Sequence, residues 1–328
     1  MLFNLQIDTI ESWIRGRGFT SVALQLPEGL KLRAIELSDT IFKDTGAKVV
    51  ILGYPCYGAC DLFTNYKAYA EGLVHFGHSP IPNLPQDDNV LYIEARADVE
   101  IDAPLRDYCD RLPQTVGLLA SVQYVHLLDR AKEIIEGSGR IAIIGRGDSR
   151  IMYPGQVLGC NCSAATAVLD SVDCYLFLGE GDFHPLAATF GVSKPVVILN
   201  PVTGEVRSVD DKRDRILRKR FAAICAAEKA QSYLVIVCGK VGQCRMAAAE
   251  DIESKLRAAG KDVYRLVTDE VTPAALLPYR VDAYVNTACP RIAMDDSVRY
   301  DRPMLTIPEV EIVLGLRNWD GYVFDSIS

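Results

Sequence analysis

The sequence predicts an α/β protein made of three similar units with parallel sheets, arranged around a central site. Short runs rich in Val, Ile and Leu alternate with amphipathic stretches along almost all of the 328 residues. These runs lack polar alternation, which is typical of strands covered on both faces of a parallel sheet. At roughly 100–200 residues per domain, the length also indicates two or three domains.

The individual elements follow from the same pattern. Gly46 closes one amphipathic stretch, as glycine often does at a helix end. Helices are expected at 31–46, 127–139 and 245–260, and the charged stretch 205–223 is expected to be a helical connector. The apolar runs predict strands at 21–26, 47–53, 89–95, 116–121, 140–145, 174–179, 195–200, 233–239, 262–267, 282–288 and 303–308.

The rhythm of these elements predicts three domains, at 1–105, 106–210 and 211–328. Each unit opens with an apolar strand and a helix, and each contains one cysteine loop marked by Gly or Pro. Sequence identity between the units is faint, so the threefold similarity depends on this shared order rather than on a repeated motif.

Composition and charge exclude several classes of protein. Apolar residues make up 49% and charged residues 24%, which is ordinary for a folded globular chain and excludes disorder. The net charge of −8 argues against broad binding to a nucleic-acid backbone. No apolar run reaches the roughly 18–20 residues of a membrane helix, and the start lacks the order of a signal peptide. We expect a cytoplasmic protein without a membrane or nucleic-acid partner.

The cysteine content is the first sign of chemistry. The chain has ten Cys but only four His. Because the cytosol keeps thiols reduced, so many cysteines indicate metal, cluster or redox chemistry, or simply small core residues. Cys174, Cys225 and Cys238 stand in apolar segments and are expected in the core.

Three other cysteines stand in loops that follow or precede regular elements. Cys60, Cys160 and Cys289 are separated by 100 and 129 residues, about one unit each. In open α/β sheets, ligands bind at the carboxyl ends of strands. Three converging thiolates suit a cubane iron–sulfur cluster with one open iron. Structural packing, a zinc site and a redox disulfide remain alternatives, and the neighbouring Cys56 and Cys162 could substitute as ligands.

Familiar motifs that are missing narrow the chemistry further. The chain has no GxxxxGK[ST] phosphate loop and no GxGxxG after a strand. Cys56 and Cys60 have the first spacing of a radical-SAM CxxxCxxC motif, but Phe63 stands where its third cysteine belongs. The standard radical-SAM motif is therefore absent.

Four segments resemble one family. LQLPEGL (24–30), YGACD (57–61), YPGQVLGC (153–160) and NTACPRIAMDD (286–296) are similar to archaeal diphthamide synthase, in the same order along the chain. The similarity extends over nearly the full length, including 178–185, 277–285 and 307–315.

The resemblance implies a fold, a cofactor and a reaction. The family has three similar α/β domains, and each gives one cysteine to a [4Fe-4S] cluster; by motif these are Cys60, Cys160 and Cys289. The GCNC segment departs from the pattern, because Cys162 is an extra thiol beside Cys160. The family transfers the 3-amino-3-carboxypropyl group of S-adenosylmethionine to imidazole C2 of a histidine in translation elongation factor 2. An electron breaks the Cγ–S bond and leaves methylthioadenosine. An external electron donor and a homodimer are also implied.

Residues that contact S-adenosylmethionine are harder to predict. Its methionyl carboxylate needs a cation and its ammonium an anion, so the candidates are charged or polar residues near the cysteine loops: Gln25, Glu28, Asp61, Arg291 and Asp296. Each of the charged candidates could instead form a structural ion pair, and Glu28 could be a carboxylate that stabilises a helix start. His184 and the HFGH segment at 75–78 are interpreted as structural, because no further ligand stands near them in sequence.

Two other functional classes stay open. Quinolinate synthase, a dehydratase, also has three α/β domains with one cluster cysteine each. A non-catalytic subunit that only passes electrons to a partner would look alike as well. The sequences of the cysteine loops favour diphthamide synthase. Production of methylthioadenosine from S-adenosylmethionine would decide between the three functions.

Overall fold

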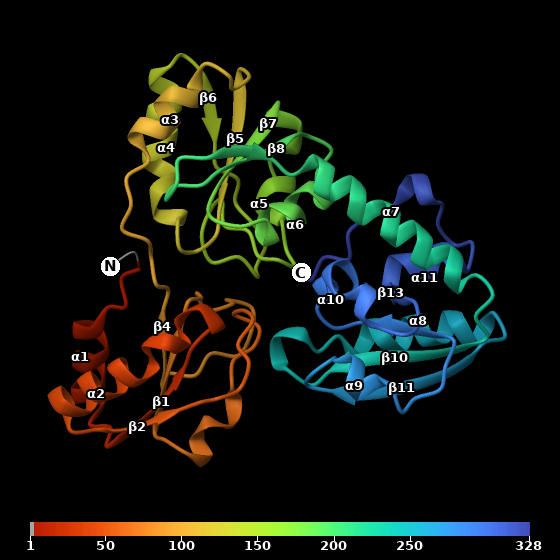
Figure 1. Cartoon of the computed structure of the whole chain (residues 1–328), viewed down its shortest axis with the longest axis horizontal. Helices are drawn as coiled ribbons and strands as arrows, with labels where there is room; N and C mark the ends of the chain where they lie inside the picture. Colours follow the sequence, from red (N-terminus) through yellow and green to blue (C-terminus); the bar gives the residue numbers. More distant parts are fainter. Residues whose placement is uncertain (1–2) are drawn as a thin grey trace.

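The computed structural model describes residues 3–328 and forms three lobes, each with its own sheet (Figure 1). The lobes follow one another along the chain and surround a common centre, with the C-terminus close to that centre in Figure 1. The α/β class and the three-unit arrangement predicted from the sequence are confirmed.

The first lobe has a four-stranded parallel sheet of order β2-β1-β3-β4. Apolar clusters cover both faces of this sheet, which explains its continuous apolar runs. The sequence did not reveal β3, whose run of five residues includes His75. The elements are α1 (Ile7–Arg17), β1 (Ser21–Gln25), α2 (Ala34–Thr45), β2 (Lys48–Ile51), β3 (Gly72–Phe76) and β4 (Val90–Ile93).

The second lobe has the sheet order β6-β5-β7-β8-β9, parallel except for the β8–β9 pair. The stretch 205–223, expected to be wholly helical, begins as strand β9 because its first residues pair with β8. The elements are α3 (Asp102–Cys109), β5 (Thr115–Ala120), α4 (Leu128–Gly137), β6 (Ile141–Ile143), α5 (Ser163–Thr166), β7 (Cys174–Leu178), α6 (Phe183–Gly191), β8 (Val196–Leu199) and β9 (Val206–Ser208).

The third lobe repeats the parallel pattern, with the order β11-β10-β12-β13. The long helix α7 begins at Asp210, where two aspartates favour the positive end of the helix dipole, and connects the second lobe to the third (Figure 1). The elements are α7 (Asp210–Ala227), β10 (Ser232–Cys238), α8 (Met246–Ala258), β11 (Asp262–Thr268), α9 (Pro273–Leu276), β12 (Ala283–Asn286), α10 (Pro290–Asp295), β13 (Met304–Thr306) and α11 (Ile307–Val313).

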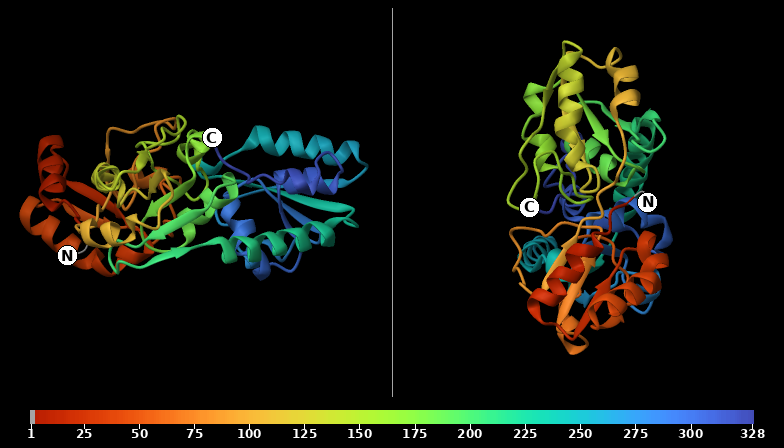
Figure 2. Two further views of the ribbon diagram at one scale, coloured as in Figure 1. Left: turned by 90° about the horizontal axis from the view of Figure 1, so that it is seen from above. Right: turned by 90° about the vertical axis from the view of Figure 1, so that its left-hand side faces the viewer.

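The borders between lobes follow packing rather than equal division of the chain. The limit expected at residue 105 falls inside α3, and Ile101 and Leu105 pack into the core of the second lobe. The C-terminal segment leaves the third lobe and returns to the second, where the Ile327 amide donates to the Cys160 carbonyl at 2.9 Å. Two turned views show this segment running from the third lobe toward the second (Figure 2).

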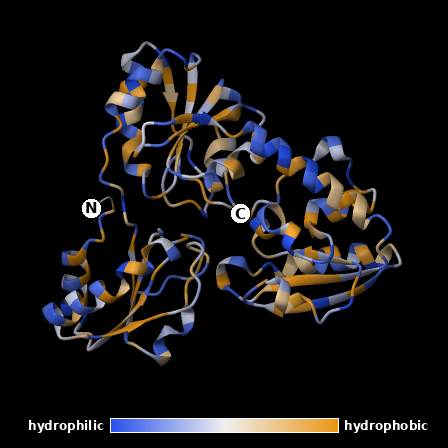
Figure 3. Cartoon of the chain, in the orientation of Figure 1, coloured by the Kyte–Doolittle hydropathy of each residue, from blue (hydrophilic) through white to orange (hydrophobic). Residues whose placement is uncertain are grey.

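Hydropathy agrees with this layering. The strands of the sheets are largely apolar, whereas α7 is largely hydrophilic along its length (Figure 3). Among residues 3–328, no helix is both long and apolar enough to cross a membrane. Short 3-10 helices complete the connections, at Glu28–Arg33, Thr64–Ala68, Val125–Leu127, Leu169–Ser171, Val241–Gln243, Ser297–Arg299 and Trp319–Gly321.

Candidate active site

One cavity brings together the three loop cysteines predicted from the sequence. It has a volume of about 420 Å³, and Cys60, Cys160 and Cys289 all line it. This volume lies within the roughly 300–1,000 Å³ of small-molecule sites. Cys60 follows β2 and Cys289 follows β12, so the fold presents the ends of these parallel strands to the centre.

The three thiols are close enough to influence one another. Burial, together with the nearby Cys160, raises the pKa of Cys60 to about 12. Burial also raises the pKa of Cys289 strongly, with Cys160 and Cys60 adding to the effect. All three sulfurs therefore hold their protons in the metal-free chain, and a metal that binds them must displace those protons.

The cysteine loop of the first lobe packs directly on a loop of the third. Gln243 donates from Nε2 to Sγ of Cys60 at 3.3 Å. Gly242 has no room for a side chain, since a Cβ there would lie 2.4 Å from the Cα of Cys60. Arg150 of the second lobe donates to the Gly242 carbonyl at 2.6 Å. These contacts tie all three lobes together at the cavity.

Arg150 also supplies positive charge beside the thiols. Its side chain is buried, and its charge opposes the rise that burial causes in the pKa of Cys160. Nε of Arg150 has no hydrogen-bond partner among the described residues. A guanidinium in this position would offset the negative charge of bound thiolates.

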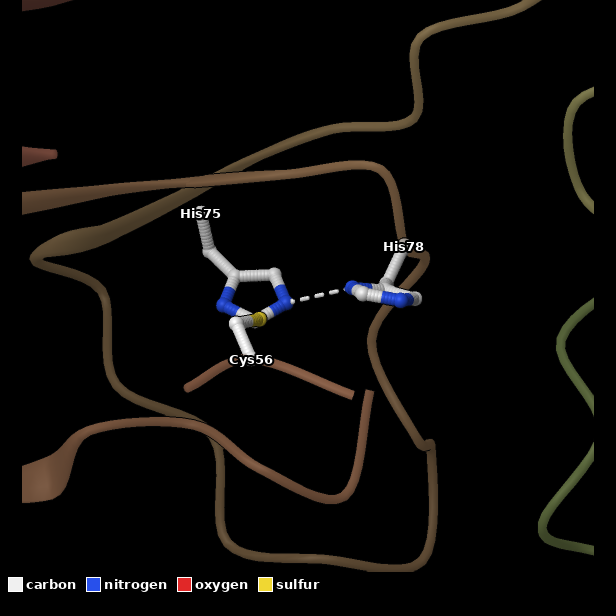
Figure 4. A group of neighbouring side chains, drawn as sticks. All are labelled: Cys56, His75 and His78. Atoms are coloured by element: carbon white, nitrogen blue, oxygen red, sulfur yellow. Dashed lines mark hydrogen bonds between the residues drawn. The ribbon is translucent and has the colours of Figure 1, made fainter. Parts of the chain in front are cut away.

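The neighbouring cysteines point elsewhere. Cys162 packs in the core of the second lobe, and a Cβ on Gly191 would lie 2.2 Å from its sulfur. Cys56 lies beside His75 and His78, with the three possible ligand atoms within 4.8 Å of one another (Figure 4). Neither Cys162 nor Cys56 is among the residues that line the cavity.

Three cysteines were expected in the core. Cys174 and Cys238 are buried, as predicted. The prediction for Cys225 is wrong, because it is exposed on α7, whose buried stripe runs through Ile224 and Ala227 instead.

Arg291 is a buried arginine that lines the cavity. Nη2 pairs with Asp295 at 2.7 Å, and the guanidinium lies 4.4 Å from the Phe183 ring centre. Nε and Nη1 have no hydrogen-bond partner among residues 3–328, and burial lowers the pKa of Arg291. A buried guanidinium with unpaired N–H groups is suited to a carboxylate ligand.

The other predicted contacts of S-adenosylmethionine lie in different surroundings. Asp296 lines the cavity mouth and pairs with Arg299 at 3.3 Å. Asp61 is buried behind the lining and pairs with Lys240 at 2.9 Å. Glu28 lies outside the lining, exposed to solvent and paired with Lys31.

Gln25 also lies outside the lining, fully buried beneath the loop that carries Cys60. Its amide donates to the Asp61 carbonyl at 2.6 Å and accepts from the Phe63 amide at 3.1 Å. Gln25 therefore holds the loop in place rather than facing the cavity.

Two histidines interpreted as structural line the cavity. His78 and His184 are both among the lining residues, and burial lowers the pKa of each to about 4. Both rings are therefore neutral near pH 7. His78 closely follows strand β3 and His184 stands at the start of α6, and these positions were the available signal.

Comparison with known proteins agrees with this geometry. A family model described as "Putative diphthamide synthesis protein" matches residues 26–323. The chain belongs to the diphthamide synthesis family. A 2-(3-amino-3-carboxypropyl)histidine synthase from Pyrococcus horikoshii is 36% identical over 100% of this chain and 94% of its own length. Subunit 1 of the human synthase is 32% identical over 91% of this chain and 69% of its own length.

Solved structures of the diphthamide synthesis family share the fold. A crystal structure of Dph2 from Pyrococcus horikoshii matches with a TM-score of 0.90 at 36% identity, covering 100% of this chain and 95% of that one. A second structure of the same protein, described as having a 4Fe-4S cluster, matches with a TM-score of 0.91 over the same shares of both chains.

Proposed function

We propose that this chain transfers the 3-amino-3-carboxypropyl group of S-adenosylmethionine to imidazole C2 of a histidine in translation elongation factor 2. The observation that carries the proposal is the meeting of Cys60, Cys160 and Cys289, one from each lobe, in a single cavity. Membership of the family supports the reaction, and the relatives carry its product in their names.

The donor set fits a [4Fe-4S] cluster. Three thiols share the cavity, from the buried Cys160 and the half-buried Cys60 and Cys289, and the guanidinium of Arg150 balances part of the Cys160 charge when it ionises. A zinc site would usually need a fourth protein ligand at short spacing. We assign Cys60, Cys160 and Cys289 as the ligands, and Cys162 to the core. When bound, the cluster supplies the electron for cleavage of the Cγ–S bond.

The chain's own residues bind and orient the substrate. Arg291 offers Nε and Nη1 to the methionyl carboxylate, because both are buried and unpaired. Asp296 at the cavity mouth is the candidate partner of the ammonium group. Apolar lining residues such as Ile81, Val122 and Val157 keep water away from the reacting centre.

The proposal also names the partners, the assembly and the location. Elongation factor 2 is the protein substrate, and an external donor supplies the electron. The chain acts as a homodimer in the cytoplasm. Sedimentation at micromolar concentration tests the dimer, with a monomer as the contrary result.

The decisive experiment analyses products of the anaerobically reconstituted chain with dithionite and S-adenosylmethionine, without the acceptor protein. We expect methylthioadenosine and a four-carbon amino acid fragment in the quenched mixture. Cys289→Ala should abolish both products, whereas the control Cys225→Ala should keep them, since Cys225 lies on the surface.

Other products would assign another chemistry. 5′-Deoxyadenosine and methionine would indicate the bond cleavage of standard radical-SAM enzymes. Absence of any cleavage with an intact reduced cluster would favour a dehydratase like quinolinate synthase or an electron-transfer subunit.

A further inference from the structure

A chain of hydrogen bonds leads from Gln25 to the cavity through two histidines. Nδ1 of His75 lies 2.8 Å from Oε1 of Gln25, and Nε2 of His75 lies 3.0 Å from Nδ1 of His78. His75 is fully buried on β3, and His78 follows it at the edge of the cavity. The reaction described above uses none of these three side chains.

The backbone sets the direction of this chain. Gln25 donates to the Asp61 carbonyl and accepts from the Phe63 amide, which fixes its oxygen on the side of His75. An amide oxygen can only accept, so Nδ1 of His75 must carry its proton. Burial lowers the pKa of His75 well below its ordinary value. The ring is therefore neutral, and its Nε2 can only accept.

The same reasoning fixes His78. Because Nε2 of His75 accepts, Nδ1 of His78 must donate, and the neutral His78 ring then has its lone pair on Nε2. Figure 4 shows Nδ1 of His78 turned toward His75 and the second ring nitrogen on the opposite side. His78 thus presents a nitrogen base of fixed tautomer to the cavity that the three cysteines line.

The transfer needs one such base. In the overall reaction, the C2–H bond of the acceptor imidazole is replaced by a C2–C bond, and the Cγ–S bond of S-adenosylmethionine becomes a lone pair on sulfur. The electron that starts the cleavage goes back to its donor when the C2 proton leaves. One proton is therefore released, and the overall reaction consumes no electron. Loss of that proton restores the aromatic ring, so a weak base suffices.

We propose that His78, with its tautomer set by Gln25 through His75, is the base that takes the C2 proton of the acceptor imidazole onto Nε2. The proposal rests on the proposed function. His78 is the catalytic residue, while His75 and Gln25 are positioning residues. The low pKa of His78 keeps Nε2 free of a proton at neutral pH.

A metal ion held by Cys56, His75 and His78 is the competing interpretation of this cluster. Tetrahedral zinc with bonds of about 2.0–2.1 Å would separate two ligand nitrogens by roughly 3.3 Å and needs a fourth ligand. The observed separation of 3.0 Å is that of a hydrogen bond, and the group offers three ligand residues, with no fourth His, Cys, Asp or Glu grouped with them among the described residues. The hydrogen-bonded arrangement is therefore the better fit.

The test measures coupling and an isotope effect with elongation factor 2 as acceptor. In His78→Gln and His78→Ala, the ratio of modified acceptor to methylthioadenosine should fall at least tenfold, and the free four-carbon fragment should rise. Deuterium at C2 of the acceptor should slow product formation more in these variants than in the wild type. Added imidazole should restore coupling in His78→Ala. The control His126→Ala, which lies outside this cavity, should couple like the wild type.

Nitrogen-15 NMR of the full chain labelled at its four histidines tests the tautomer without any turnover. We expect His78 with a proton on Nδ1 and none on Nε2, and a loss of this preference in Gln25→Leu. A proton on Nε2 of wild-type His78 would overturn the proposal. So would unchanged coupling and isotope effect in both His78 variants, or one zinc per chain that Cys56→Ser removes. If the wild type releases no methylthioadenosine, that result contradicts the proposed function itself, and with it the role of His78.

Discussion

Two arginines of the chain are buried to a similar degree, but only one of them has hydrogen-bond partners for its whole guanidinium group. Arg220 of α7 donates to both carboxylate oxygens of Glu309, at 2.7 and 2.5 Å, and to the carbonyls of Ala293 and Met304. Arg291 at the cavity pairs with Asp295 alone and leaves Nε and Nη1 without a partner among the described residues.

The pKa of each guanidinium follows this difference. For Arg220, burial lowers the pKa, but Glu309 more than compensates and the net shift is upward. For Arg291, burial prevails over the attraction of Asp295 and the net shift is downward. A satisfied buried arginine joins α7, α10 and α11, whereas an unsatisfied one is ready for a ligand. The comparison thus distinguishes a buried arginine that stabilises the fold from one that is available to bind a ligand.

The largest expected effect comes from breaking the satisfied pair. Glu309→Ala leaves Arg220 buried without its carboxylate, so the free energy of unfolding should fall by about 3–5 kcal/mol. Urea unfolding of the full chain measures this change. Replacing both partners, with Arg220→Met and Glu309→Leu, should recover most of the loss. If Glu309→Ala lowered the free energy of unfolding by less than about 1 kcal/mol, the Arg220–Glu309 pair would contribute no more than a surface salt bridge. Arg220 and Arg291 would then no longer differ in the way described.

The next effect concerns the unsatisfied arginine. Arg291→Gln should weaken binding of S-adenosylmethionine to the cluster-loaded chain about 100-fold, or about 2.7 kcal/mol, because a buried charge-assisted hydrogen bond is lost. Stability should change by less than about 1 kcal/mol, since few native contacts are lost. Anaerobic calorimetry measures the affinity and urea unfolding the stability.

Arg299→Gln is the matched control for this variant. Arg299 also lines the cavity but is exposed and pairs with Asp296. Its loss should alter the affinity by no more than about threefold, as for other exposed ion pairs. If Arg291→Gln destabilised the chain as strongly as Glu309→Ala and bound substrate normally, Arg291 would be structural like Arg220.

A smaller effect concerns pH. The pKa of His184 in the folded chain is about 4, lowered by burial and by the nearby Arg291 and His78. Below about pH 6.5 the unfolded chain takes up a proton that the folded chain refuses, so stability falls as the pH drops toward 4. Between pH 7 and pH 5 this histidine should cost about 2 kcal/mol.

His184→Gln should therefore lose less stability than the wild type over the same interval. Urea unfolding at pH 7 and pH 5 gives the two differences, and carboxylates that titrate in this range cancel in the comparison. An identical loss in both proteins would mean that His184 is solvated in the folded chain.

How far the sequence predicts this site depends on the kind of contact. Cys60 and Cys289 could be found because parallel strands direct their carboxyl ends to one place. Cys160 lies well beyond the end of β6 and could be found from its loop motif. Arg291 follows Cys289 closely and could be found as well. Glu28 was a candidate by its place in a loop motif, yet its side chain points to solvent.

Contacts between lobes were invisible in the sequence. Arg150 reaches a carbonyl 92 positions away, and Gln243 reaches a sulfur 183 positions away. Neither stands in a pattern that predicts such a partner. The hydrogen bond between Gln25 and His75 joins register partners on β1 and β3, and His78 closely follows β3. It could not be predicted because the sequence did not reveal β3. Cys225 was placed wrongly because one residue along a helix changes the face by about 100°.

The central claim is that three lobes share one cluster through three thiols. Iron and sulfide content with an optical spectrum, on anaerobically reconstituted protein, tests it most directly. The wild type should hold about four irons per chain. Cys60→Ala, Cys160→Ala and Cys289→Ala should each lose most of the iron and the absorption, whereas the core variants Cys162→Ala and Cys174→Ala should keep both. Full iron in Cys160→Ala together with its loss in Cys162→Ala would contradict the ligand set.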